Sequence, residues 1–188
     1  MDLVKLHLGA AKRRLRGFIN IDREYSDGLD LVTDVSDLSA FEDSSVSDIY
    51  TSHTLEYFDR VEVLAVLAEW RRVLSHGGKL HIAVPDFKRL IEIYSKTGEL
   101  SSIIGPLFGR WINENNGETI YHKTVWDFDS LKASLEECGF ESVTRFDPIS
   151  YLEEIDPEFD DYSLAFYPHM DRDGIPVSLC LEATLRRS

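Results

Sequence analysis

The chain has 188 residues, a formal net charge of −14 and a pI near 4.8, with 43% hydrophobic and 29% charged residues. This length and composition predict one globular domain, residues 1–188, with a sizeable core. The strongly negative field repels other polyanions, so nucleic acid and anionic membranes are disfavoured as partners.

The two cysteines and the N-terminus bear on where the protein works. Cys138 and Cys180 lie apart with no paired spacing, which indicates reduced core thiols rather than a disulfide or a metal knuckle. No apolar stretch is long enough to span a bilayer, and the N-terminus has no signal-peptide pattern. We therefore expect a cytoplasmic protein.

Three short apolar segments near the N-terminus are each typical of a buried strand. Residues 3–8 run into a turn at Gly9, residues 18–22 end at Asp22, and residues 29–34 end at Asp34. In an open parallel α/β sheet, a ligand lies across the carboxyl ends of the strands. The two carboxylates therefore share one edge, where Asp22 can accept both hydroxyls of a ribose and Asp34 can accept from an adenine amino group.

The middle of the chain has the pattern of a strand, a helix and a strand. Residues 47–52 predict a fourth strand, and Asp59 with Glu62 three residues later resembles a capping box that begins a helix. Gly77 and Gly78 predict the end of that helix and a tight turn into a fifth strand, residues 79–84, which Pro85 ends.

Two less regular segments interrupt the alternation further along the chain. Residues 86–126 predict a substrate-side insertion whose aromatic residues would form a lid or an acceptor wall, namely Phe87, Tyr94, Phe108, Trp111, Tyr121 and Trp126. Asp129 predicts a helix that Gly139 ends, residues 142–146 a sixth strand, and residues 177–183 the last strand. A variable excursion, residues 147–173, precedes the last strand. We expect most of residues 151–173 to be a solvated surface loop, although Tyr162, Tyr167 and His169 could form part of the acceptor wall.

Strands that alternate with helices in this way predict an α/β protein with a doubly wound, Rossmann-like sheet. Seven short motifs then make the chain resemble a known family. They are Leu6-His7-Leu8-Gly9, Gly17-Phe18-Ile19-Asn20-Ile21-Asp22, Thr33-Asp34-Val35, Ser52-His53-Thr54-Leu55-Glu56, Arg72-Val73-Leu74-Ser75-His76-Gly77-Gly78, Val84-Pro85-Asp86 and Cys138-Gly139-Phe140. In order and spacing the chain resembles the class I S-adenosylmethionine-dependent methyltransferases, and most closely the small type 11/12-like members linked to glycan and polysaccharide pathways.

The resemblance implies a seven-stranded, mostly parallel sheet with an antiparallel last strand, and S-adenosylmethionine as the cofactor. It also implies cofactor-binding residues. Gly9, Ala10 and Ala11 would pass under the methionine part, Asp22 would hold the ribose, Asp34 and Val35 would border the adenine, and Ser52 and His53 would face the methyl group.

The first loop departs from the family pattern, because Gly9 alone remains of several glycines and Ala10-Ala11 follow it. Alanine adds a methyl group where a backbone must touch a ligand or adopt a positive φ, so we expect weaker cofactor binding or a different loop path. The segment to Gly17 is also short for a first crossover helix. A dinucleotide would need G-x-G-x-x-G for its pyrophosphate, and this loop lacks the second and third glycines.

A basic run and the histidines leave alternatives open. Lys12, Arg13, Arg14 and Arg16 predict either a solvated turn or a contact for a phosphate or carboxylate. His7 and His81 lie inside predicted strands, where a packed, hydrogen-bonded histidine is expected.

Three residues are candidate catalytic bases: His53 after the fourth strand, Asp86 after the fifth, and His122 before a late helix. Each also has a structural interpretation, such as a helix cap for Asp86 and a local hydrogen bond for His122. Their scattered spacing has no recognised metal-site pattern, so no metal is expected.

The predicted activity is O-methylation of a sugar or glycan hydroxyl, whose proton a positioned side chain must remove. A carboxylate acceptor would need no base, and an N- or C-directed methyltransferase is a further alternative. The altered first loop leaves a third interpretation, a non-catalytic binding module. The expected partner is a small molecule or glycan, and the sequence does not indicate an oligomeric state.

Overall fold

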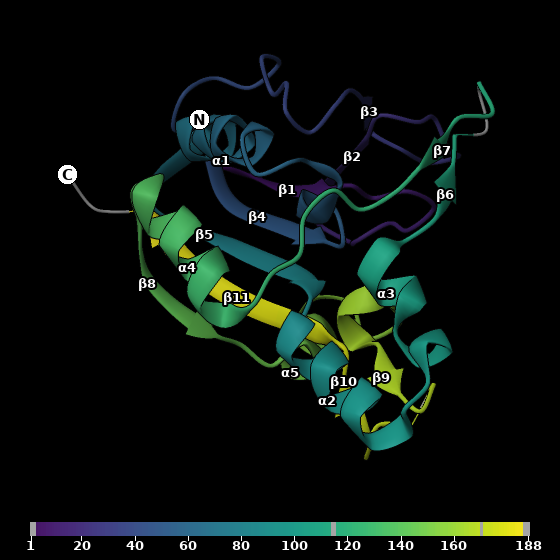
Figure 1. Ribbon diagram of the computed structural model, residues 1–188. Helices are drawn as coiled ribbons and strands as arrows, with labels where there is room; N and C mark the ends of the chain where they lie inside the picture. Colours follow the sequence, from purple (N-terminus) through teal and green to yellow (C-terminus); the bar gives the residue numbers. More distant parts are fainter. Residues whose placement is uncertain (1–2, 114–115, 170, 186–188) are drawn as a thin grey trace.

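A seven-stranded sheet forms the centre of the molecule (Figure 1), in a computed structural model that describes residues 3–113, 116–169 and 171–185. Its strands are β1 (Val4–Leu8), β2 (Ile19–Asp22), β3 (Leu31–Val32), β4 (Val46–Ser52), β5 (Leu74–Pro85), β8 (Phe140–Arg145) and β11 (Ser178–Leu185), in the order β3-β2-β1-β4-β5-β11-β8. The first five pair in parallel, and β11 runs antiparallel to both β5 and β8. The predicted doubly wound fold with an antiparallel last strand is confirmed.

Helices on one face of the sheet close the main core. α1 (Glu62–Val73) and α4 (Phe128–Glu137) pack there, with Trp70 and Leu131 fully buried among strand residues such as Leu6. The predicted capping box of α1 is present, since Glu62 N donates to Asp59 Oδ1 (2.9 Å) and Glu62 Oε2 accepts from Asp59 N (2.8 Å). Such reciprocal bonds satisfy amide groups that the first turn leaves without a helical partner.

The predicted end of the first long helix is wrong. α1 ends at Val73 and β5 begins at the next residue, so Gly77 and Gly78 lie within the strand. They form part of a bulge, because Leu74 pairs with Val46 and Lys79 with Asp48. A Cβ at Gly78 would come 2.8 Å from the Ser75 carbonyl oxygen, which is why the bulge contains glycine.

The helix after the insertion begins earlier than predicted. Its N-cap is Asp127, whose Oδ1 accepts from Ser130 N at 2.9 Å, rather than Asp129. Both aspartates precede the same apolar run, so the pattern of the sequence alone does not separate them.

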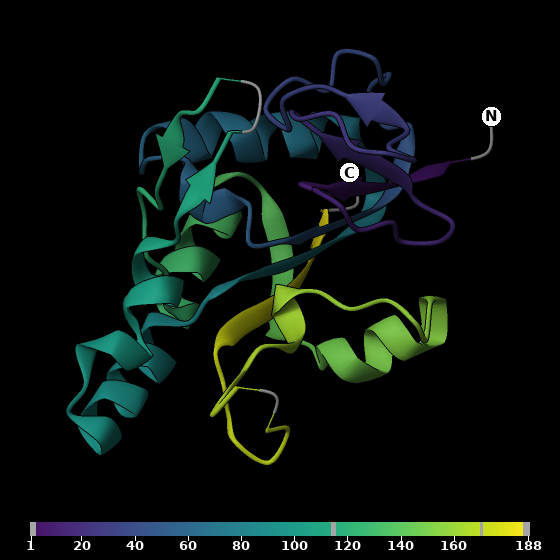
Figure 2. The ribbon, with the colours of Figure 1, turned by 90° about the vertical axis from the view of Figure 1, so that its right-hand side faces the viewer.

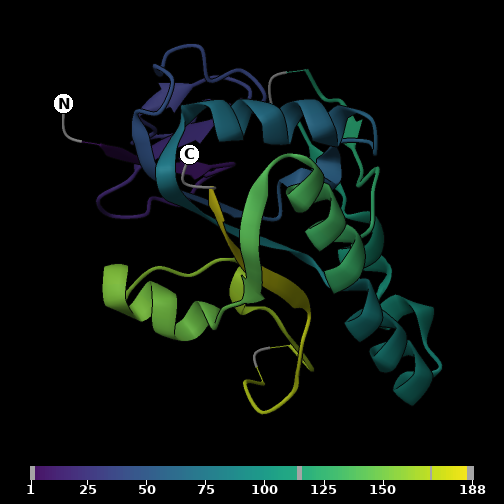
Figure 3. The same ribbon diagram turned by 90° about the vertical axis from the view of Figure 1, so that its left-hand side faces the viewer.

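The second face of the sheet has no helix between β1 and β2, and the excursion covers it instead. α5 (Pro148–Ile155) and the short helix η3 (Tyr162–Leu164) lie on this side, opposite α1 and α4 (Figure 3). Leu152 and Phe159 of the excursion pack with Leu15, Phe18 and Tyr50 in a second buried cluster. The excursion is therefore more than a solvated loop, because its apolar residues close this face of the core.

The basic run joins the first loop to this excursion. Arg13 Nε donates to the Asp160 carbonyl oxygen (2.6 Å), and Arg16 pairs with Glu158 (2.7 Å) and Asp156 (3.6 Å). Opposite charges on the two segments therefore hold them together over the open face.

The insertion forms an arm beside the sheet (Figure 2). It contains α2 (Phe87–Thr97), η2 (Leu100–Ser102), α3 (Ile104–Phe108) and the antiparallel pair β6 (Trp111–Ile112) and β7 (Thr119–Ile120). A small cluster that includes Leu90, Ile103 and Val177 anchors the arm, next to the pair β9 (Phe166–Tyr167) and β10 (Ile175–Pro176). Residues 114–115 of the predicted insertion lie outside the described part of the chain.

The predicted core histidines and cysteines behave as expected. His7 is 2% exposed and hydrogen-bonded to Asn20 Oδ1 (2.9 Å), and burial lowers the pKa of its imidazole. His81 is 3% exposed and bonded to Glu182 Oε2 (2.9 Å). Cys138 and Cys180 are both free thiols. In the described ranges, the helices are too short or too polar to cross a bilayer.

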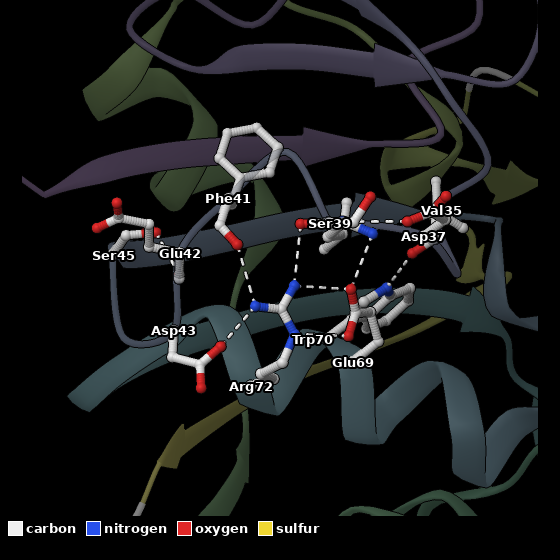
Figure 4. A network of polar contacts seen from close by, with 11 residues as sticks. Val35, Asp37, Ser39, Phe41, Glu42, Asp43, Ser45, Glu69, Trp70 and Arg72 are labelled. Atoms are coloured by element: carbon white, nitrogen blue, oxygen red, sulfur yellow. Dashed lines mark hydrogen bonds and ion pairs between the residues drawn. The ribbon is translucent and has the colours of Figure 1, made fainter.

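A network around Arg72 fixes the segment between β3 and β4 against α1 (Figure 4). The guanidinium donates to both carboxylate oxygens of Glu69 (2.8 Å each), to Asp43 (2.7 Å) and to the carbonyl oxygens of Leu38 and Phe41 (3.0 Å each). These bonds hold the pKa of Glu69 below its usual value, and Glu69 Oε1 also accepts from Leu38 N (2.9 Å). A segment with no helix or strand of its own is thus tied down at several carbonyls.

We expect Arg72→Ala to lower the free energy of unfolding by about 2 kcal/mol, because charge-assisted hydrogen bonds of this kind contribute about 1.5–3 kcal/mol. Urea denaturation followed by circular dichroism measures the change. Arg71→Ala, the exposed neighbour on α1, is the matched control. Equal stability of the two variants would contradict the proposed anchoring.

Candidate functional site

A cavity of about 490 Å³ opens at the carboxyl ends of β1, β2 and β4. Every predicted cofactor-binding residue lines it: Gly9, Ala10, Ala11, Asp22, Asp34, Val35, Ser52 and His53. The parallel strands bring these residues together from four separate segments of the chain. The edge of the sheet at which a ligand was predicted to bind therefore contains a cavity.

Gly9 allows two of these segments to approach closely. Its φ is +73°, and a Cβ at this position would overlap the side chain of Thr54. Gly9 N and Ala10 N both donate to the Ile21 carbonyl oxygen, at 2.9 and 3.0 Å. The end of β1 is thus bonded to β2 on one side and pressed against the segment after β4 on the other.

Ala11 carries the strain of the glycine-poor loop. Its φ is +46°, a left-handed conformation that alanine adopts reluctantly. Its amide donates to Asp22 Oδ2 at 2.8 Å, so the same backbone turn aims the loop at this carboxylate. The loop therefore keeps a path suited to glycine although the residue is alanine.

Asp22 lies at the edge of the cavity with one hydrogen bond to each oxygen. Oδ2 accepts from Ala11 N (2.8 Å) and Oδ1 from Glu24 N (2.9 Å), and the residue is 9% exposed. An ionised carboxylate offers about four lone-pair positions, so acceptor capacity remains toward the cavity. The two amide bonds fix the orientation of the carboxylate.

The segment after β3 forms the neighbouring wall. Asp34 Oδ1 accepts from the amide (3.0 Å) and the hydroxyl (2.7 Å) of Ser36, which closes a tight turn. Val35 is buried, and its carbonyl oxygen accepts from the indole of Trp70 at 2.9 Å. This wall is therefore held by the α1 contacts described above.

The chemistry of these residues fits S-adenosylmethionine. A fixed carboxylate with free lone pairs suits ribose hydroxyls, and an apolar side chain beside a second carboxylate suits adenine. Ser52 also lines the cavity, and its buried Oγ has no hydrogen-bond partner among the described residues.

The far part of the cavity has an aromatic and polar lining. Tyr57, Phe58, Trp111 and Tyr162 supply the aromatic rings, and Glu62, Glu118 and Lys123 supply charged groups. Lys123 and Glu62 pair at 3.0 Å. Burial raises the pKa of Tyr57 to about 12, so its phenol is neutral.

The aromatic prediction for the insertion holds for one residue only. Trp111 lines the cavity, whereas Trp126 is buried in the main core and Phe87, Tyr94, Phe108 and Tyr121 are exposed elsewhere. Tyr57 and Phe58 also line the cavity; they were not predicted, although they directly follow the Ser52 to Glu56 motif and could have been found from that position.

The three candidate bases do not meet at one point. His53 lines the cavity, with 12% of its side chain exposed. Asp86 is not among the lining residues; it is 1% exposed, caps α2 through Lys88 N (3.1 Å) and lies 3.4 Å from Arg145. Asp86 therefore caps α2, as its structural interpretation predicted.

His122 also lies outside the lining. Its Nδ1 is 3.1 Å from the Pro106 carbonyl oxygen, its ring meets Tyr57 edge-on at 4.8 Å, and burial lowers its pKa. Between His53 and His122 lies a residue to which the sequence analysis assigned no role, Glu56. Among the described residues, no group of three or more His, Cys, Asp or Glu side chains is arranged to hold a metal ion.

Comparison with known proteins agrees with this geometry. Residues 2–82 match a sequence family described as a methyltransferase domain. No curated protein matches the chain.

Solved structures share its fold at low sequence identity. A SAM-dependent methyltransferase from Methanosarcina mazei has a TM-score of 0.57 and 16% identity, over 100% of this chain and 94% of that chain. One from Archaeoglobus fulgidus has a TM-score of 0.56 and 14% identity, over 97% and 86%.

A third structure is a complex of the Haloferax volcanii Trm112 methyltransferase activator with a putative methyltransferase. It has a TM-score of 0.51 and 16% identity, over 100% of this chain and 85% of that chain.

We expect Ala11→Gly to raise the free energy of unfolding by about 0.5 kcal/mol. A left-handed conformation costs an L residue about 1–2 kcal/mol, and the larger entropy of an unfolded glycine offsets about 0.5–1 kcal/mol of the relief. The control is Ala10→Gly, where φ is not positive and a buried methyl group is lost, so stability should fall. A loss of stability in both variants, measured by urea denaturation, would contradict strain at Ala11.

Asp22→Asn should weaken binding of S-adenosylmethionine about 10- to 100-fold, because hydrogen bonds to a charged acceptor contribute about 1.5–3 kcal/mol. Isothermal titration calorimetry measures the affinity. Asp27→Asn, an exposed aspartate outside the cavity lining, is the control. Unchanged affinity in Asp22→Asn would remove this carboxylate from the binding site.

Proposed function

We propose that this protein is an S-adenosylmethionine-dependent methyltransferase and that it methylates an oxygen atom of a small polar acceptor, a sugar or glycan hydroxyl. The observation that carries the proposal is that one cavity joins two different linings. An acidic rim suited to a nucleoside lies on one side, and an aromatic and charged compartment lies on the other.

The cofactor would lie along the rim. We assign the ribose to Asp22, the adenine to Asp34 and Val35, and the methionine part to the loop from Gly9 to Ala11. When bound, S-adenosylmethionine supplies an electrophilic methyl group on a sulfonium. The residues of the chain then have to align the acceptor with that group and exclude water, which is the main source of catalysis in an in-line displacement.

The acceptor would occupy the far compartment. The rings of Tyr57, Trp111 and Tyr162 suit the apolar faces of a sugar, and Glu62 and Lys123 suit its hydroxyl groups. The net charge of −14 supports a neutral or small acceptor over a nucleic acid or an anionic membrane. Two free thiols suit a reducing compartment such as the cytoplasm.

A sugar hydroxyl must lose its proton during the transfer, so a protein group has to assist that loss. Of the three candidates, His53, Asp86 and His122, we place His53 first because it lines the cavity. A carboxylate or nitrogen acceptor and a non-catalytic binding module remain the competing functions, the last because the first loop is poor in glycine.

The test is turnover of a panel of hydroxylated, carboxylated and amine acceptors with labelled S-adenosylmethionine, by the wild type and by His53→Ala, Asp86→Ala and His122→Ala. We expect methylation of a hydroxyl compound and a loss of about 100-fold in kcat for His53→Ala, the size typical of general acid–base or electrostatic assistance. Asp86→Ala and His122→Ala should retain more activity than His53→Ala. Binding of S-adenosylmethionine with no methylation of any acceptor would favour the binding module.

A further inference from the structure

Glu56 is a buried carboxylate that makes no hydrogen bond through either side-chain oxygen in the described structure. It lies in the short helix η1 (Leu55–Tyr57), directly after the strand that ends in Ser52 and His53. Its Oε1 is 3.3 Å from His53 Nδ1 and 3.8 Å from His122 Nε2. A buried charge without a partner is costly, so the protons on the two imidazoles decide the state of this group.

The partners of His53 determine where its first proton lies. Its Nε2 is 2.8 Å from Ser178 Oγ, and Ser178 Oγ is 2.7 Å from the Tyr162 carbonyl oxygen. A carbonyl oxygen only accepts, so the single hydroxyl proton of Ser178 points to Tyr162. Nε2 must then donate to Ser178, and a neutral His53 would turn an unprotonated Nδ1 toward the carboxylate.

The other neighbours of Glu56 do not supply the missing proton. His122 Nδ1 faces the Pro106 carbonyl oxygen, so its one proton lies there, and burial lowers the pKa of the ring and keeps it neutral. Its Nε2 therefore presents a second lone pair to the same carboxylate oxygen. The phenol of Tyr57 is neutral, and the ring of Tyr162 stands 5.5 Å from that of His53.

We propose that Glu56 is a positioning residue that holds His53 as an imidazolium, with the second proton on Nδ1, which lies 3.3 Å from Glu56 Oε1. The proton is assigned to Nδ1 because this nitrogen is the nearest donor to a buried carboxylate that has no hydrogen-bond partner among the described residues. The pair carries no net charge as a whole, so it satisfies the buried carboxylate without placing an unbalanced cation beside a sulfonium.

The consequence for the reaction rests on the proposed function. His53 is the cationic end of this neutral pair and the end that lines the cavity, so it stabilises the acceptor oxygen as its proton leaves for water, rather than taking the proton as a base. The oxygen electron pair then forms the bond to the methyl carbon, and the electron pair of the broken carbon–sulfur bond stays on sulfur. This arrangement would accelerate methylation most for an acceptor whose hydroxyl group is acidic, because such a group loses its proton to water most readily.

Nitrogen NMR of the protein labelled with ¹⁵N-histidine tests the proposal without any acceptor. The His53 signals are assigned by their absence in His53→Asn. At pH 7 we expect both ring nitrogens of His53 to be protonated in the wild type, and one of them to lose its proton in Glu56→Gln, whose amide can itself donate to Nδ1. Glu182→Gln is the matched control, because Glu182 bonds a different histidine, His81 within β5.

An unprotonated Nδ1 of His53 in the wild type overturns the proposal, as does a His53 spectrum that is the same in Glu56→Gln. The wild-type spectrum alone is decisive, so a variant that fails to fold leaves the test intact. These results do not depend on methylation of any compound, and they are therefore separate from the fate of the proposed function.

With an active acceptor, the pH profile gives a second readout. A positive His53 predicts that kcat/KM falls as pH rises and the imidazolium is lost, whereas a base predicts a fall as pH is lowered. Glu56→Gln should reduce kcat about 100-fold and leave the affinity for S-adenosylmethionine unchanged. Loss of cofactor binding in parallel with kcat would instead indicate a purely structural role.

Discussion

The close approach of Gly9 to Thr54 is the constraint on which the site depends. The ends of β1 and β4 meet there at a distance that no side chain on residue 9 allows. This contact sets the loop from Gly9 to Ala11 beside the segment from Ser52 to Glu56, so the residues proposed for the cofactor and the residues proposed for the acceptor share one hollow. The left-handed Ala11 is a consequence, because the loop must turn back at once to reach Asp22.

A second constraint arises from the missing crossover helix between β1 and β2. Without that helix, one face of the sheet would expose Leu15, Phe18 and Tyr50 to water. The excursion covers the face with its own apolar residues, and opposite charges tie it to the first loop in a strongly acidic chain. The excursion also supplies Tyr162 to the cavity, so the same segment completes the core and forms part of the acceptor wall.

The polar groups around His53 show how the packing of distant strands determines the hydrogen-bond partners of a residue in the cavity. Ser178 belongs to β11 and lies 125 residues from His53 along the chain, yet its hydroxyl oxygen is 2.8 Å from His53 Nε2 because β11 pairs with β5. That one contact determines which nitrogen faces Glu56. The antiparallel last strand thus has a role in the proposed protonation of the site as well as in the sheet.

The sequence by itself determined the strand positions and the acidic rim. Buried parallel strands are short apolar runs, and residues that end such strands must share one edge of the sheet, so Asp22 and Asp34 could be placed without coordinates. Only the tertiary structure decided the role of the excursion. Its polar composition is typical of a loop, and its few apolar residues become buried only because one face of the sheet has no helix to cover it. The separation of His53, Asp86 and His122 and the burial of Glu56 were likewise decided by packing, since hydrogen bonds between side chains depend on distances that sequence spacing does not encode.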